Sequence, residues 1–158
     1  MYLKNGLCCC FTGHRPEKLK CSEKEIKNKL ESAIDNAIGN GYTHFITGMA
    51  RGVDIWAAEI VVERKKHYDL NLICAIPHPE FDKYRNEYEK GQYNRIIGQA
   101  DSVLILSTHY SRYCYQKRNK FMVDNSELVI AAFGGENGGT KNTIDYAKRK
   151  KIKIINIM

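Results

Sequence analysis

Four short segments of this chain carry glycine, arginine or both, the residue types that are typical of sites that bind anions. Glycine lets backbone N–H groups approach an anion closely, and the N-terminus of a following helix adds about half a positive charge. An arginine beside such a turn can hold a phosphate through two hydrogen bonds. The segments are TGHR at 12–15, TGMARGVD at 47–54, RN at 118–119 and GGTKNT at 138–143.

These segments predict one binding site for a phosphate-bearing ligand. The turns at 48–54 and 138–143 would hold the phosphate between them, with Arg118 or Arg51 supplying a charged contact. Each turn taken alone is equally well explained as a tight connection that needs glycine. The predicted ligand-binding residues are Thr12, Gly13, His14, Arg15, Gly48, Met49, Ala50, Arg51, Gly52, Asp54, Arg118, Asn119, Gly138, Gly139, Thr140, Asn142 and Thr143.

Other side chains leave two interpretations open. His14 is either a ligand contact or an exposed imidazole on a turn. Tyr110, Tyr113 and Tyr115 either stack on a base or, as we prefer, pack a loop over the core. The P-loop pattern and the GxGxxG fingerprint are both missing, and no His/Cys cluster has the spacing of zinc ligands. We therefore expect no metal and no required cofactor.

The elements that must position these residues alternate along the chain. Apolar runs predict strands at 7–12, 43–47, 70–76, 102–106, 128–133 and 152–157. Helical spacing follows a capping box at 22–25, begins again at 52, and recurs at 116–125 and near 142–150. Phe81, Tyr84 and Tyr88 also fit one helical face, which Gly91 weakens or ends.

This alternation predicts an α/β fold: a Rossmann-like, doubly wound, mainly parallel sheet of about six strands with helices on both faces. The chain of 158 residues is the size of one domain, so we expect a single domain over 1–158. Ligands of such sheets bind beyond the carboxyl ends of the strands, where all four glycine or arginine segments are expected.

Composition adds weaker constraints. The net charge of +7 favours anionic partners without choosing among nucleotides, nucleic acids and simple solubility. The first residues, 1–5, lead into an apolar run that His14 and Arg15 soon end, so we expect no signal peptide, no membrane span and a cytoplasmic location. The six cysteines are expected to be small buried hydrophobic residues without disulfides.

The segments resemble the SLOG superfamily, the Rossmann-like group of Smf/DprA and the LOG phosphoribohydrolases, and most of all its small YpsA-like proteins. The matching stretches are FTGHRPEKL (11–19), TGMARGVDIWAAE (47–59), QKRNKFMVDNSELVIAAF (116–133) and GGTKNT (138–143), in the family's order. The resemblance implies a nucleotide or an ADP-ribose-like nucleotide-sugar as ligand. It also implies a homodimer as a candidate assembly.

The LOG branch hydrolyses an N-glycosidic bond with a catalytic Arg and Glu, and Arg118 stands at the matching arginine. Aligning Thr143 puts Tyr146 where the Glu is expected, and Asp145 lies one residue early, about 100° around a helix. The resemblance therefore leaves three functions open. The first is nucleotide binding or sensing. The second is a hydrolase with Arg118 and either Asp54 or Asp145 as its catalytic residues, and the third is DprA-like binding of single-stranded DNA.

Overall fold

The computed structural model describes residues 6–158, so the expectation about the first five residues lies outside it. Strands and helices alternate as predicted. The strands are β1 (Leu7–Gly13), β2 (Tyr42–Thr47), β3 (Asn71–Ile76), β4 (Ser102–Ile105), β5 (Leu128–Ala132) and β6 (Lys153–Asn156). The helices are α1 (Glu23–Gly39), α2 (Val53–Arg64), α3 (Glu87–Gln99), α4 (Cys114–Asp124) and α5 (Gly139–Arg149), with a short 3₁₀ turn at Pro16–Lys18.

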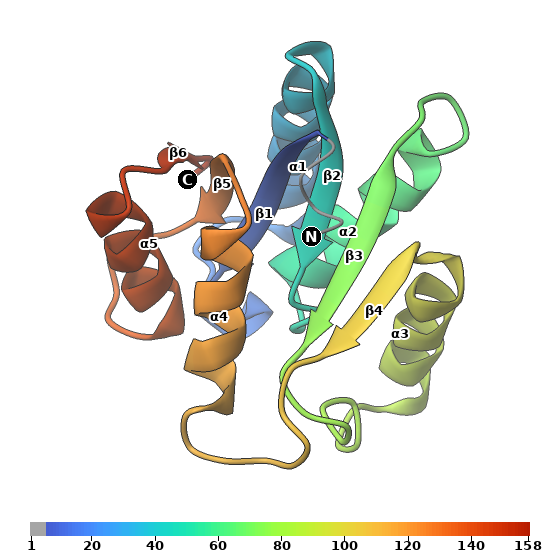
Figure 1. Cartoon of the computed structure of the whole chain (residues 1–158), viewed down its shortest axis with the longest axis vertical. Coiled ribbons are helices and arrows are strands. Elements are labelled where there is room, and N and C mark those ends of the chain that lie inside the picture. Colours follow the sequence, from blue (N-terminus) through green and yellow to red (C-terminus); the bar gives the residue numbers. More distant parts are fainter. Residues whose placement is uncertain (1–5) are drawn as a thin grey trace.

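The six strands form one parallel sheet in the order β4-β3-β2-β1-β5-β6 (Figure 1). The chain moves outward from β1 to β4 and then returns to the other side of β1 to form β5. The order therefore reverses between β1 and β5, which stay paired as far as Gly13 and Ala132. The chain leaves these two strands toward opposite faces of the sheet, into α1 and α5, and such a switch point forms a crevice for ligands. The predicted α/β, doubly wound fold is confirmed.

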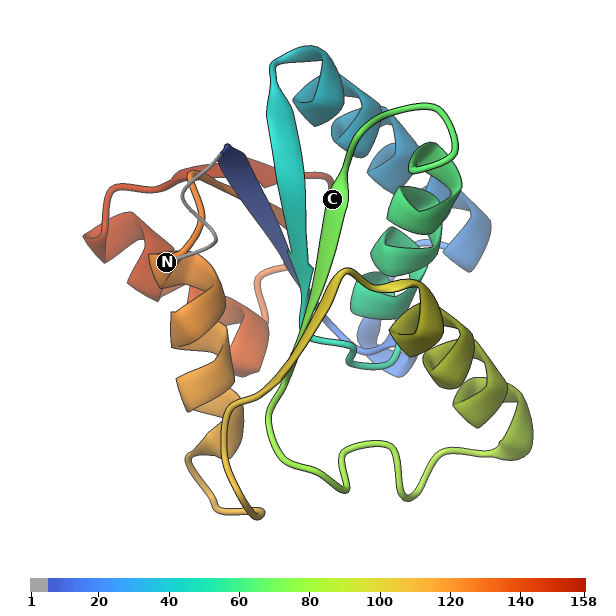
Figure 2. The ribbon, with the colours of Figure 1, turned by 45° about the vertical axis from the view of Figure 1, so that its right-hand side comes forward.

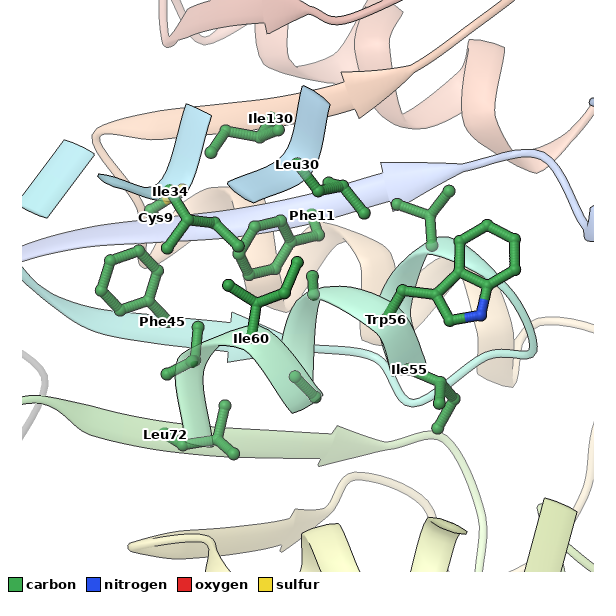
Figure 3. Packing of buried hydrophobic residues seen from close by; sticks show 14 of the residues in the cluster. Cys9, Phe11, Leu30, Ile34, Phe45, Ile55, Trp56, Ile60, Leu72 and Ile130 are labelled. Carbon is green, nitrogen blue, oxygen red and sulfur yellow. The ribbon is translucent and has the colours of Figure 1, made fainter. Parts of the chain in front are cut away.

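The two faces of the sheet are covered by different helices. Helices α1, α2 and α3 pack on one face and α4 and α5 on the other (Figure 2). On the first face Phe11 and Phe45 stack with ring centroids 6.2 Å apart beneath Leu30 and Ile60 (Figure 3). Cysteines 8, 9 and 10 alternate between the two faces and are all fully buried. Cys74 and Cys114 are buried as well, as expected, whereas the expectation is wrong for Cys21, which is half-buried.

The prediction of a helical face through Phe81, Tyr84 and Tyr88 is wrong. Residues 79–84 form turns, and α3 begins only at Glu87 because Asn86 caps it. The Asn86 side chain accepts a hydrogen bond from the Glu89 N–H, and the Glu89 carboxylate accepts one from the Asn86 N–H, a complete capping box. The helix then continues through Gly91, while Tyr84 and Tyr88 lie exposed.

Within residues 6–158, no helix has the length and apolar character needed to cross a membrane.

Candidate functional site

A cavity of about 480 Å³ lies at the carboxyl ends of β1 and β5, where the strand order reverses. All four predicted segments contribute to its lining. The turn after β1, the start of α2, the middle of α4 and the start of α5 meet here, together with two aromatic rings. Its lining includes Thr12, Gly13, His14, Arg15, Ala50, Asp54, Phe81, Tyr115, Arg118, Asn119, Gly138, Gly139 and Thr140.

Gly48 does not itself line the cavity, but Arg118 and Asp54, which do, pack closely against it. The Arg118 guanidinium donates to the Gly48 carbonyl oxygen, and it also reaches the Ala75 carbonyl at 3.4 Å. A Cβ on Gly48 would stand 2.7 Å from Arg118 Nη1 and 2.8 Å from Asp54 Oδ2. Only glycine therefore leaves room for Arg118 and Asp54 to pack this closely against the turn.

The backbone N–H groups of this turn are already used. Asp54 Oδ2 accepts from the Ala50 N–H at 3.2 Å, and Thr47 Oγ1 accepts from the Met49 N–H at 3.2 Å. The prediction that the 48–54 turn shares a phosphate with the 138–143 turn does not fit this geometry, because Asp54 occupies the place of an anion on the first turn.

The turn before α5 is different, because within residues 6–158 no side chain caps the helix that follows it. Gly138 is the N-cap of α5 with a φ of 144°, and the cap carries no side-chain hydrogen bond. The first turn of the helix contains no acidic residue. Uncapped N–H groups and the positive end of the helix dipole therefore face the cavity, which is the arrangement that binds phosphate.

Buried charge in the site is unbalanced toward positive. Arg118 and Arg85 are buried guanidinium groups, and Asp54 is the one buried carboxylate among residues 6–158. Arg85 donates to the Met49 carbonyl oxygen, and both guanidinium groups lie over the Phe81 ring, at 5.0 and 5.4 Å from its centroid. Burial lowers the pKa of both arginines and raises the pKa of Asp54, although Arg118 opposes that rise.

His14 lines the same cavity with an unsatisfied atom. Its side chain is 7% exposed and rests against the Phe133 ring, with centroids 5.5 Å apart. Within residues 6–158, the Nε2 atom of His14 is the one buried side-chain nitrogen or oxygen without a hydrogen-bond partner. Buried polar atoms without partners cost free energy, so this atom calls for a ligand group. The interpretation of His14 as an exposed imidazole is wrong.

A cluster of aromatic residues borders the cavity. His78, Phe81, Tyr110 and Tyr115 contact one another with ring centroids 5.5 to 6.1 Å apart. Tyr115 and Phe81 reach the cavity, whereas Tyr113 does not line it and is largely exposed. Packing, our preferred interpretation, describes Tyr115 and, in part, Tyr110, whose ring contacts His78 and Tyr115 although its side chain is 61% exposed; it fails for Tyr113.

Several predicted ligand residues lie outside the cavity. Arg51 is held by two carboxylates, with Nη2 to Glu17 at 2.7 Å and Nε to Glu89 at 2.9 Å. Met49 is buried in the core with a φ of 60°, and Gly52 packs against Pro16 at the start of α2. Asn142 and Thr143 line a neighbouring depression between α4 and α5.

The two carboxylates proposed for a hydrolase lie apart. Asp145 also lines the depression between α4 and α5 and pairs with Lys141 at 2.8 Å, which lowers its pKa. Tyr146 stands where the resemblance to the LOG branch expects the catalytic glutamate, and its hydroxyl donates a hydrogen bond to Asp124 Oδ1 at 2.7 Å. Asp54 alone of the two acids meets Arg118 in the cavity. The sequence reasoning missed Arg85 and Phe81, because both were read as part of a helix.

Comparisons with known proteins agree with this fold. The sequence model of the YpsA family, described as "YspA SLOG family", matches residues 9–157. The chain belongs to the YpsA family. It is 33% identical over 142 residues to the uncharacterized SPbeta prophage-derived protein YoqJ of Bacillus subtilis, a match that covers 79% of this chain and 81% of that protein. It is 29% identical over 157 residues to a UPF0398 protein of Macrococcus caseolyticus, covering 91% and 86%.

Solved structures show where the YpsA-family fold recurs. DNA processing protein A of Streptococcus pneumoniae superposes with a TM-score of 0.68 at 17% identity. DNA processing protein A of Helicobacter pylori, solved to describe its single-stranded DNA binding mode, superposes with a TM-score of 0.69 at 18% identity. Each match covers 96% of this chain but only 50% and 65% of those proteins, so this YpsA-family chain shares one domain's fold with them.

Proposed function

We propose that this YpsA-family protein binds a nucleotide or an ADP-ribose-like nucleotide-sugar in the cavity between β1 and β5. The observation that carries the proposal is the unfilled chemistry of that cavity. An uncapped helix N-terminus, the buried guanidinium of Arg118 and the unpartnered Nε2 of His14 all line one space of about 480 Å³. An anion with an attached polar and aromatic part is the ligand that satisfies all three.

The phosphate belongs on the turn before α5 rather than on the turn after β2. The N–H groups of Gly139 and Thr140 lie at the open N-terminus of α5, whereas Asp54 occupies the other turn. Arg118 lines the same cavity, with its Nε donating to Asn119 Oδ1 at 2.8 Å. The phosphate therefore lies within reach of a helix dipole and near a buried guanidinium.

His14 and the aromatic cluster then face the rest of the ligand. The Nε2 atom of His14 can accept from a ribose hydroxyl or, in the other tautomer, donate to a phosphate or ring oxygen. Tyr115 and Phe81 line the same cavity and offer aromatic faces to the ligand. A nucleoside attached to the phosphate fits this order of groups from the phosphate to the base.

Isothermal titration calorimetry with inorganic phosphate, nucleoside monophosphates, dinucleotides and ADP-ribose tests the proposal. We expect the wild type to bind at least one phosphate-bearing nucleotide. His14→Ala removes no hydrogen bond within residues 6–158, so its fold should survive, and we expect it to bind about tenfold more weakly. Arg118→Ala is the complementary variant and should bind more weakly still.

Arg51→Ala is the matched control, because this arginine pairs with Glu17 and Glu89 outside the cavity. It should bind the nucleotide as the wild type does. A wild type that binds none of these compounds would refute the proposal. Equal affinity in the wild type and in His14→Ala and Arg118→Ala, both folded by circular dichroism, would also refute it.

A further inference from the structure

The outer surface of α4 and α5 carries a second feature that the cavity does not use. The chain from Leu106 to Val123 contains no acidic residue, but it contains four cations and three tyrosines. Helix α4 occupies the second half of this stretch and lies beside α5 on one face of the sheet (Figure 1). We call this surface the basic face, and define it by Arg112, Tyr113, Gln116, Lys117, Lys120, Tyr146 and Arg149.

Two depressions run along α4 and join at its exposed side chains. One, of about 340 Å³, lies between α4 and α5, and the other, of about 530 Å³, lies on the far side of α4. Gln116 and Lys120 line both of them. The first depression also shares Tyr115, Asn119 and Gly139 with the cavity between β1 and β5. The basic face is therefore hollowed along its length and reaches the cavity.

The cations of this surface have no carboxylate partners. Among residues 6–158, Arg112, Lys117, Lys120 and Arg149 form no ion pair within 4 Å. The acids at the edges of the surface are already occupied. Asp124 accepts the Tyr146 hydroxyl and has Lys150 at 3.9 Å, while Asp145 pairs with Lys141. The surface thus presents positive charge that the protein itself does not neutralise.

Aromatic rings lie among these cations. Lys120 Nζ, Arg149 Cζ and Lys150 Nζ lie over the Tyr146 ring, 5.5 to 5.7 Å from its centroid. Tyr113 is 63% exposed, and the Arg112 guanidinium lies 5.3 Å from its ring centroid. A large exposed ring beside unpaired cations is the combination that binds nucleic acid strands, because bases stack on the ring while phosphates meet the charges.

We propose that the basic face binds single-stranded nucleic acid. The rings require unpaired bases, which a duplex keeps stacked within itself. A second copy of this chain is a poor occupant, because a two-fold interface would bring the same unpaired cations together. The proposal goes beyond nucleotide binding in the cavity and does not depend on it, since the contributing side chains differ.

Fluorescence anisotropy with a labelled oligothymidylate tests this surface. We expect the double variant Lys120→Gln/Arg149→Gln to lower the steepness of the log K against log salt plot by about 1.4, at about 0.7 for each lost phosphate contact. Tyr113→Ala should weaken binding by about fivefold or more, the lower end of one lost base stack. Both changes are at exposed positions, so the fold should persist.

Two matched controls test whether the effects depend on where the residues lie. One removes the same total charge elsewhere, and the other removes a tyrosine elsewhere. Lys24→Gln/Lys29→Gln removes the same charge from exposed positions of α1, on the opposite face of the sheet, and should leave the salt dependence unchanged. Tyr68→Ala removes a 53% exposed tyrosine from the connection between α2 and β3, at the other edge of the sheet, and should bind as the wild type does.

Several results would overturn the proposal. These are no binding by the wild type, equal affinity for the single strand and a duplex of equal length, or equal losses in the basic-face variants and their controls. A ribonucleotide strand is run in parallel to tell RNA from DNA. Mononucleotide calorimetry on Lys120→Gln/Arg149→Gln keeps the two proposals distinct. If this variant loses binding of the strand and keeps binding of the nucleotide, the strand binds at the basic face and not in the cavity.

Discussion

Gly139 offers the sharpest test of where the phosphate lies. It is the first residue of α5, it lines the cavity, and a Cβ placed on it meets no atom within 4 Å. Replacing Gly139 with aspartate puts a carboxylate at the helix N-terminus, in the position that we assign to the phosphate. Gly139→Asn adds a side chain of the same shape without the charge, and serves as the control.

The two variants should separate stability from binding. A carboxylate in the first turn stabilises a helix by about 0.3–1 kcal/mol, so Gly139→Asp should melt about 1–4 °C above Gly139→Asn. The same carboxylate repels a bound phosphate. At about 5 Å and an effective dielectric constant of about 20, one pair of unit charges costs roughly 3 kcal/mol, which weakens binding by roughly a hundredfold.

Calorimetry with the tightest nucleotide of the panel and thermal melting by circular dichroism measure both quantities. The expected pattern is a more stable protein that has lost most of its nucleotide affinity, set against a control that keeps it. If Gly139→Asp binds that nucleotide as tightly as Gly139→Asn, then the phosphate does not lie at the start of α5 and our assignment is wrong.

Three other predictions concern the buried part of the site and the core. Gly48→Ala should lose about 1–3 kcal/mol of unfolding free energy in urea titrations, because its Cβ overlaps Arg118 and Asp54; Gly98→Ala, with open space around it, should not lose stability. Burial raises the pKa of Asp54 above 3.8, so the folded state holds this proton at pH values where the unfolded state has released it. The contribution of Asp54 to stability should therefore fall as the pH rises from 3.8 through the raised pKa, and the difference in unfolding free energy between Asp54→Asn and the wild type should change across that window; a constant difference would contradict this. Burial raises the pKa of the Cys8, Cys10 and Cys74 thiols to about 12, so iodoacetamide at pH 8 should label the half-buried Cys21 first in the native protein, as peptide mass spectrometry would show, and early labelling of Cys8 or Cys10 would count against the structure.

The glycine-rich turns could be located from sequence because each joins an apolar run to a helical pattern, which is local information. Helix α3 could not be bounded in that way. Phe81 and Tyr84 have helical spacing, but the capping box at Asn86 starts the helix later. Arg85 and Phe81 consequently stayed hidden as site residues, since their importance comes from contacts with Met49 and Arg118 that are distant along the chain.

The sequence by itself determined the alternation of strands and helices, the parallel fold and the set of turns that gather at one edge of the sheet. Hydrophobic periodicity and glycine placement are enough for this, because they act over neighbouring residues. Tertiary structure alone decided which turn stays open to an anion. The two glycine-containing turns at 48–54 and 138–143 differ because Asp54 accepts from the Ala50 N–H of the first, while no side chain caps the N-terminus of α5 within residues 6–158. It also decided that Arg51 is neutralised by Glu17 and Glu89 while Arg118 is buried beside the cavity, because the partners of a charged side chain are set by packing between distant segments.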